Sequence, residues 1–317
     1  MILRRYHLFI IYTLIAGLLA WNLFLQFGKK TENPNTEEVL VRSAEGEQFR
    51  ISIPEAKARI FEIPEKLTFA DEPVPMEQAD VLERFEREIY VNVYWQSNMI
   101  LLMKRAGKYL PTIEKILQEQ GIPDDFKYLA MTESGLMNVA SQAGARGFWQ
   151  IMPGTAKDYK LEVSDDVDER YHLEKSTLVA CKYLKSAYSK FGNWTSVAAS
   201  YNIGITGIRK RKEEQNQSNY YNLYLVEETS RYLFRILAFK EIFENPGKYG
   251  FELTEKDKYK LPLLRELKLT QSINSLANWA IQHNSTYKDL KIHNPWLRSQ
   301  KLKIEKNQDY IIKLPIY

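Results

Sequence analysis

Glu133 is the residue of this sequence best placed to do chemistry. It lies in the segment 123–135, whose pattern predicts a helix with Phe126, Leu129, Ala130 and Glu133 on one face. An apolar environment disfavours the charged form of a carboxyl group and raises its pKa, which suits a general acid near neutral pH. On this helix alone, a solvent-exposed Glu133 at a frayed end is the simpler interpretation, because most helical glutamates are exposed.

Three further blocks follow Glu133-Ser134-Gly135 and favour the catalytic interpretation. They are Gly-Ala-Arg-Gly-Phe-Trp-Gln-Ile-Met-Pro-Gly-Thr-Ala at 144–156, Ala-Ser-Tyr-Asn-Ile-Gly at 199–204 and Glu-Thr-Ser-Arg-Tyr at 228–232. In type and order, the four blocks resemble soluble lytic transglycosylase domains. The similarity covers about residues 95–250 and is greatest to the membrane-bound lytic transglycosylase D group.

The resemblance implies a lysozyme-like helical fold and cleavage of the β-1,4 bond between N-acetylmuramic acid and N-acetylglucosamine in peptidoglycan. Such enzymes use no cofactor and no water, because the C6 hydroxyl of the muramic residue attacks its own C1 and closes a 1,6-anhydro ring. One carboxyl group then suffices as acid and base, since an internal nucleophile has a very high effective concentration. Ordinary glycosidases need a second carboxylate.

The resemblance also assigns roles to individual residues. Glu133 is the catalytic acid and base, and Ser134, Ser141 and Tyr201 are expected to support its carboxyl group. The residues expected to bind substrate are Gln150, Met152, Tyr201, Asn202, Glu228 and Tyr232. Trp149 is expected to anchor its turn rather than to contact sugar.

Simpler interpretations of these residues remain open. Tyr201 and Tyr232 could be core aromatics, and Glu228 could be a solvated helix charge, although Arg231 is a natural partner for it. A lysozyme-type muramidase would use the same glutamate with water as nucleophile, but it would need a positioned aspartate that no motif supplies. A non-catalytic wall-binding protein is the third possibility. It would be favoured if another residue stood in place of Glu133, but the glutamate is present.

Composition excludes several other classes of function. The net charge of +4 is a modest basic surplus, and lysines and arginines alternate with acids instead of forming a basic stripe, so nucleic-acid binding is a poor fit. The sequence contains no zinc-type Cys/His spacing, no phosphate loop and no dinucleotide fingerprint, and we expect no metal. Asp165, Asp166 and Asp168 could offer oxygen ligands to calcium, but a solvated loop is the simpler interpretation. Cys181 is expected in the core.

The N-terminus is expected to attach the protein to a membrane. Residues 8–27 are apolar, and twenty helical residues at ~1.5 Å each match the ~30 Å hydrocarbon layer. No small-residue cleavage site ends the run, so an uncleaved anchor in residues 1–30 is favoured over a cleaved signal. The resemblance then places the catalytic domain in the periplasm, within the cell envelope, with glycan strands as its partner. No feature of the sequence indicates a protein partner.

The rest of the chain divides into three parts. Residues 31–75 are polar and interrupted by prolines, as in a linker, with one strand-like segment at 48–53. Residues 76–250 form a mainly α domain, in which Pro111 is expected to open a new helix and residues 227–244 another. A helix at 176–191 is expected to be capped by Ser176 and the next helix by Thr195. In the helix at 176–191, the side chains expected to face the core are those of Leu178, Cys181, Leu184 and Tyr188.

The last part, residues 251–317, changes pattern. Strand-like segments at 267–269 and 310–314 enclose two short helical segments at 275–283 and 286–293. This β-α-α-β order resembles a LysM module, a small peptidoglycan-binding domain. The resemblance rests on residues 275–277, 294–297 and 312–315. The overall expectation is a mainly α protein with a small C-terminal α+β module.

Overall fold

The computed structural model describes residues 36–42, 48–54 and 58–316. The chain divides after Ile60 into two compact units. In the first unit, β1 (Thr36–Arg42) pairs antiparallel with β2 (Gln48–Pro54). The strand expected at 48–53 is therefore confirmed. The expected anchor in residues 1–30 lies outside the described residues, and no helix in the described part of the chain is long and apolar enough to cross a bilayer.

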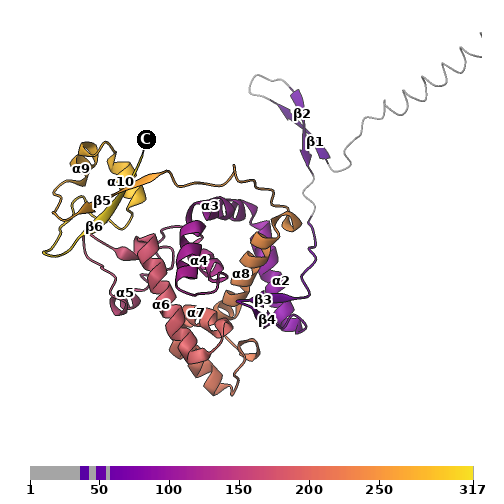
Figure 1. Ribbon diagram of the computed structural model, residues 1–317. Helices are drawn as coiled ribbons and strands as arrows, with labels where there is room; N and C mark the ends of the chain where they lie inside the picture. The colour runs from indigo at the N-terminus through magenta and orange to yellow at the C-terminus, as the bar shows by residue number, and fades with distance from the viewer. Residues whose placement is uncertain (1–35, 43–47, 55–57, 317) are drawn as a thin grey trace, which may run out of the picture. The chain divides into compact units, whose positions relative to one another are not determined.

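The second unit begins with a short hairpin and continues as a set of packed helices (Figure 1). The elements up to residue 249 are β3 (Leu67–Phe69), β4 (Glu72–Val74), α2 (Ala79–Tyr94), α3 (Gln96–Glu119), α4 (Phe126–Ser134), α5 (Pro153–Asp158), η1 (Glu169–Tyr171), α6 (Leu173–Phe191), α7 (Trp194–Glu214), η2 (Tyr220–Asn222), α8 (Glu227–Glu244) and η3 (Pro246–Tyr249). Helix α8 packs against α2, α4 and α7, while α6 packs against α3 and α7. The expectation of a mainly helical domain is confirmed.

Helix α3 differs from the expectation, because Pro111 lies inside it and does not open a new helix. An interior proline costs about 3 kcal/mol. The helix nevertheless buries one continuous apolar stripe on both sides of the proline, including Leu102, Leu110 and Leu117. Burial of each such side chain contributes about 1.5–3 kcal/mol. Packing along the stripe therefore outweighs the local cost of the proline.

The hairpin of β3 and β4 lies within the residues that the sequence assigned to a linker. Leu67, Phe69 and Val74 are buried in the main core. The carboxylate of Glu72 accepts hydrogen bonds from the N–H (2.8 Å) and hydroxyl (2.6 Å) of Thr195 at the start of α7. The compact unit that contains the helical domain thus begins at Phe61 and includes this hairpin. Local polarity and prolines could not indicate this, because the partners of the hairpin, such as Phe126 for Phe69 and Thr195 for Glu72, are distant in sequence.

Two expected helix caps also differ from the structure. Helix α6 begins at Leu173, and Ser176 is buried within its first turns. Asn193 caps α7 instead of Thr195, through a 2.9 Å hydrogen bond from the N–H of Ser196. Thr195 lies inside the first turn of α7, two residues beyond the cap residue, and its hydroxyl donates to Glu72.

The inward face of α6 is confirmed for only two of the four expected side chains. Cys181 and Leu184 are fully buried, as a core position for the thiol requires. Leu178 and Tyr188 are 36% and 39% exposed. The ring of Tyr188 instead stacks on Trp194 of α7, with centroids 4.2 Å apart.

The C-terminal module contains β5 (Leu264–Leu269), α9 (Leu276–Gln282), α10 (Tyr287–His293) and β6 (Tyr310–Pro315), in the predicted order. The two strands pair antiparallel, with Leu264 opposite Pro315. The apolar core of the module also includes Val167 and Tyr171 from the helical domain. The loop before α6 is therefore part of the packing of the module.

Candidate active site

The position of Glu133 follows from how α4 ends. Phe126, Leu129 and Ala130 are fully buried, and Gly135 closes the helix in the left-handed conformation (φ 59°). Glu133, on the same face, is only partly exposed. Burial raises the pKa of its carboxyl group to about 7, against the opposing effects of a Tyr232 hydrogen bond and the Arg235 charge. The predicted rise in pKa is confirmed, and its cause is the predicted one.

Tyr232 of α8 is the direct hydrogen-bond partner of the Glu133 carboxyl group. Its hydroxyl donates a short hydrogen bond to Oε1 of Glu133. Tyr232 is buried, and burial, followed by the charge of Glu133, raises its own pKa, so the hydroxyl keeps its proton. Because Oε1 is occupied, Oε2 is the oxygen that is free to carry a transferable proton.

One face of α8 adds two charges near Glu133. Glu228, Tyr232 and Arg235 are spaced i, i+4 and i+7 on the helix, which places them on the same face. The negative charge of Glu228 raises the pKa of Glu133 and the positive charge of Arg235 lowers it. Glu228 is exposed and lies 3.5 Å from Nη1 of Arg235. It is thus a solvated charge that acts on Glu133 through space.

Arg231 does not pair with Glu228, contrary to the expectation. Its Nε donates a 2.6 Å hydrogen bond to Oε1 of Glu88 in α2. Oε2 of Glu88 lies 3.7 Å from Nε of Arg235. Glu88 is 1% exposed, so the carboxylate is a buried anchor for both arginines. Arg231 pairs with Glu88 because the helical repeat places residue 231 on the side of α8 that faces α2.

The three residues expected to support the carboxyl group lie elsewhere in the hydrogen-bond network. Ser134 is buried and donates to the carbonyl of Ala130 at 3.2 Å. The Ser141 hydroxyl accepts from the N–H of Ala145 at 2.9 Å and so closes a turn of the loop. The Tyr201 hydroxyl donates to the carbonyl of Trp149 at 2.8 Å.

Tyr201 is nevertheless close enough to the site to respond to its charge. Burial raises the pKa of the Tyr201 hydroxyl, and the negative charge of Glu133 raises it further. Tyr201 therefore ties α7 to the loop after Glu133 and remains a neighbour of the carboxyl group. The structure gives the direct hydrogen bond to Tyr232, which the sequence had placed among substrate-binding residues.

The block 144–156 forms a tight loop beside α4. Trp149 is fully buried and its Nε1 donates to the Thr177 hydroxyl at 2.8 Å, so it anchors the loop as predicted. Gln150 has φ 45°, and its amide donates to the carbonyls of Val139 (3.2 Å) and Gly147 (2.9 Å). Met152 is 43% exposed and precedes α5, so its side chain is accessible to a substrate.

A break in α7 places Tyr201 and Asn202. Gly204 lies inside the helix with φ 80° and ψ 157°, a conformation that is essentially restricted to glycine. The chain turns there, and Nζ of Lys212 donates to the Ser196 hydroxyl at 2.7 Å, joining the two halves. Asn202, just before the break, accepts from the Thr229 hydroxyl at 2.9 Å. Two of the four sequence blocks are therefore bonded to each other.

Sequence reasoning missed Arg235 and Glu88. Arg235 could have been found, because it follows Tyr232 by three residues on the same face of α8. Glu88 carried no signal, because α2 lies far from the other blocks in sequence and only the packing of α2 on α8 brings it near.

The aspartate cluster is not a simple solvated loop. Asp165 is exposed, but Asp168 is buried and bonds Arg170 through both oxygens, at 2.9 and 2.7 Å. Asp166 accepts from the N–H of Lys303 in the C-terminal module at 3.1 Å. No group of three or more potential metal ligands occurs in the described residues.

Replacement of Tyr232 by Phe should move the alkaline limb of activity to higher pH. The hydroxyl hydrogen bond stabilises the ionised carboxyl group, and its loss should raise the pKa of Glu133 further above 7. The maximal rate should fall about 10–100-fold, as expected for a lost hydrogen bond to a charged group. The pH profile of kcat/KM tests this. An alkaline limb that stays in place would remove Tyr232 from control of Glu133.

Comparison with family models identifies two parts of the chain. Residues 111–224 match the transglycosylase SLT domain, and residues 265–316 match the soluble lytic transglycosylase C-terminal LysM-like domain. The chain therefore contains a transglycosylase SLT domain followed by a LysM-like module, as the sequence predicted.

Parts of this chain are similar to curated proteins and to one solved structure. The chain is 29% identical over 159 residues to membrane-bound lytic murein transglycosylase D of Escherichia coli strain K12, covering 48% of this chain and 35% of that protein. The protein of the same name from E. coli O6:H1 strain CFT073 gives the same values. This chain thus spans about a third of the length of these relatives. The solved structure of the 70 kDa soluble lytic transglycosylase SLT70 from E. coli aligns with a TM-score of 0.36 and 23% identity, over 46% of this chain and 26% of that chain.

Proposed function

We propose that this protein, with its transglycosylase SLT domain and LysM-like module, is a peptidoglycan lytic transglycosylase. The observation that carries the proposal is the environment of Glu133. A carboxyl group with a pKa of about 7 is partly protonated at neutral pH and can both donate and accept a proton there. The Tyr232 hydrogen bond holds Oε1 and leaves Oε2 for the substrate.

In the proposed reaction, protonated Glu133 gives its proton to the glycosidic oxygen between N-acetylmuramic acid and N-acetylglucosamine. The bond from that oxygen to C1 breaks, and positive charge develops on C1 and the ring oxygen. The ionised Glu133 then accepts the proton of the muramic C6 hydroxyl as its oxygen bonds to C1. The 1,6-anhydro ring closes, the carboxyl group regains its proton, and no water is consumed.

Substrate contacts are proposed for residues around this carboxyl group. The exposed Met152 side chain offers apolar contact to a sugar face. The hydrogen bonds within the protein leave the amide oxygen of Gln150 as an acceptor and the amide N–H groups of Asn202 as donors for hydroxyl or N-acetyl groups of the glycan. Glu228 and Arg235 set the local potential, since their charges act on Glu133 with opposite sign.

Hydrolysis by a lysozyme-type muramidase is the alternative. It needs a second carboxylate that activates water or stabilises the intermediate. The acidic side chain that acts on Glu133 within the described residues is Glu228, which is exposed and faces Arg235. That environment suits a solvated charge better than a general base. A non-catalytic wall-binding role would leave the raised pKa of Glu133 without a purpose.

The masses of the products distinguish these reactions. A fragment from about Phe61 onward, incubated with purified peptidoglycan, should release muropeptides that end in 1,6-anhydromuramic acid. Hydrolysis adds one water that ring closure does not, so mass spectrometry separates the two. Reducing ends as the main product would replace the proposal by a muramidase, and no release at all would favour the wall-binding role.

We also propose that the protein is held in the cell envelope by the apolar segment 8–27, with the catalytic domain in the periplasm. The segment has the length of a membrane span. The full-length chain should remain in the membrane fraction after a high-salt wash and keep its first residues. A mature N-terminus near residue 28, determined by mass analysis, would instead indicate a cleaved signal.

A further inference from the structure

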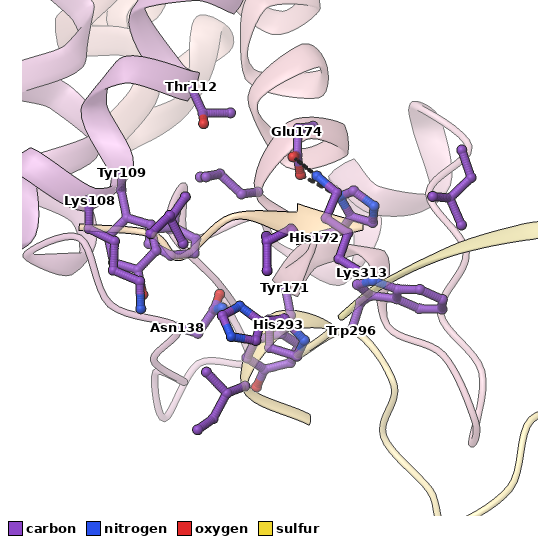
Figure 2. Close-up of a pocket in the computed structure, with 17 residues that line it drawn as sticks. Lys108, Tyr109, Thr112, Asn138, Tyr171, His172, Glu174, His293, Trp296 and Lys313 are labelled. Atoms are coloured by element: carbon purple, nitrogen blue, oxygen red, sulfur yellow. Dashed lines mark hydrogen bonds and ion pairs between the residues drawn. The ribbon is translucent and has the colours of Figure 1, made fainter. Parts of the chain in front are cut away.

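A cavity of about 80 Å³ lies where the helical domain meets the LysM-like module, and Glu133 is not part of its wall (Figure 2). Lys108 and Tyr109 of α3 form one side and Asn138, from the loop after α4, another. The segment 171–174 and the module, through His293, Trp296 and Lys313, close the rest. Both parts belong to the same compact unit.

The cavity wall is built from firm contacts between the two domains. Nζ of Lys313 forms a short hydrogen bond to Oε1 of Glu174, and Nδ1 of His172 lies 3.1 Å from the other oxygen of that carboxylate (Figure 2). The N–H of Asp168 donates to the carbonyl of Trp296 at 2.8 Å. These contacts hold the cavity open as a formed site and not as a gap between mobile parts.

The charge inside the cavity is positive. Burial would raise the pKa of Glu174, but the hydrogen bonds from His172 and Lys313 lower it to about 2, so this carboxylate is ionised and already compensated. Lys108 forms no ion pair with any described residue and lies 5.0 Å over the ring of Tyr109. Burial, followed by the Lys108 charge, lowers the pKa of His293 against the opposing charge of Asp289, which disfavours a second cation there. Lys108 is the cation left to attract an anionic group.

Asn138 supplies an unused hydrogen-bonding group. Its Oδ1 is buried and has no hydrogen-bond partner among the described residues. Buried polar atoms are rarely left unpaired, because the loss of hydration costs free energy that no bond returns. This oxygen is closed off from the cavity, so the group that Asn138 can offer a ligand is its amide nitrogen, whose N–H groups can donate to a ligand oxygen.

Two aromatic residues of the cavity, Tyr171 and Trp296, do not offer a platform for sugar. The guanidinium of Arg298 lies 4.2 Å over the ring of Tyr171. Trp296 is stacked with both His172 and Tyr310, at centroid distances of 5.8 and 5.4 Å. Because these ring faces are covered, a pyranose cannot stack on them. The groups left for recognition are the Lys108 cation and the Asn138 amide.

We propose that this cavity binds a carboxylate-bearing amide group of the peptide stems of peptidoglycan. The carboxylate pairs with Lys108 and the adjacent amide with Asn138. Complete ligands usually need about 300–1,000 Å³, so a cavity of about 80 Å³ takes one residue-sized group while the rest of the peptide stays outside. This inference rests on the proposed function for its substrate class. It gives the junction between the two domains a role in substrate selection, because glycan strands would be recognised by the peptide stems that they carry.

Direct binding tests the cavity without any catalysis. The full chain is titrated calorimetrically with the dipeptide L-alanyl-D-glutamate and with the same dipeptide amidated at both carboxyl groups. The diacid should bind at least tenfold more tightly than the diamide. Lys108→Gln should weaken diacid binding about tenfold, and Asn138→Asp should weaken it further by repulsion. Lys115→Gln, a 74% exposed lysine on the same helix, is the matched control and should bind as wild type does.

Equal affinities for diacid and diamide, or equal affinities of wild type and Lys108→Gln, would overturn the proposal. A second measurement compares intact sacculi with sacculi stripped of stems by an amidase. Lys108→Gln should lower the ratio of kcat/KM on intact strands to that on stripped strands about tenfold, and an unchanged ratio would also count against it. If wild type releases no anhydro products from either substrate, the proposed function fails, while the calorimetry still decides whether the cavity binds the dipeptide.

Discussion

Glu133→Gln should abolish turnover and leave the fold intact. The substitution preserves the size of the side chain and an oxygen that accepts the Tyr232 hydrogen bond, but it removes the transferable proton. General acid–base catalysis is worth ~10²–10⁴-fold. Because one group serves both half-reactions in the proposed mechanism, we expect a loss at or above ~10⁴-fold in kcat. Release of anhydromuropeptides from peptidoglycan measures it.

The same variant has an expected stability signature. The folded-state pKa of Glu133, about 7, is above its ordinary value of 4.5, so folded protein binds this proton more tightly than unfolded protein does. Wild type therefore loses stability as pH rises from about 4.5 to 7, by at most about 3 kcal/mol. The Gln variant lacks this loss and should melt at or above the wild-type temperature at pH 8, with the difference shrinking toward pH 4.5. Activity within tenfold of wild type would remove Glu133 from the mechanism, and a large fall in Tm would make it structural.

Gly147→Ala should strongly destabilise the protein. Gly147 has φ 79°, where an L side chain costs roughly 1–2 kcal/mol. An added Cβ would also lie 1.9 Å from the carbonyl oxygen of Arg170. That backbone cannot easily move, because the Arg170 side chain is bonded to Asp168 and to the carbonyl of Gly144 (3.0 Å). Together with overpacking, the cost should reach about 2–5 kcal/mol, a fall in Tm of roughly 5–15 °C.

Gly154→Ala is the matched control from the same block. It lies in α5, and an added Cβ there meets nothing within 4 Å. Alanine is favoured over glycine in a helix by about 1 kcal/mol, so this variant should be as stable as wild type or slightly more so. Thermal unfolding of both variants tests the pair. Equal melting temperatures would mean that the loop adapts to a side chain at residue 147.

Local pattern was sufficient for the presence of most helices, whereas the acid was identified only together with the order of the four motif blocks. The buried stripe of Phe126, Leu129 and Ala130 indicated both α4 and the raised pKa of Glu133, since burial of a face and desolvation of a carboxyl group on it have the same cause. The order of strands and helices in the module was likewise readable from the sequence. The spacing of apolar residues within one or two helical turns is enough to predict the position of a helix or strand and the face that it buries.

Tertiary packing decided which groups meet. The donor to Glu133 is Tyr232, 99 residues away, and Glu88 holds Arg231 across 143 residues, so no local spacing could indicate either pair. Packing likewise kept α3 continuous through Pro111 and brought the β3–β4 hairpin into the core. The sequence by itself determined the type of domain and indicated Glu133 as the candidate acid, because these depend on short-range periodicity and motif order. Only the tertiary structure decided the partners of the acid and the cavity at the domain junction, because these depend on long-range burial.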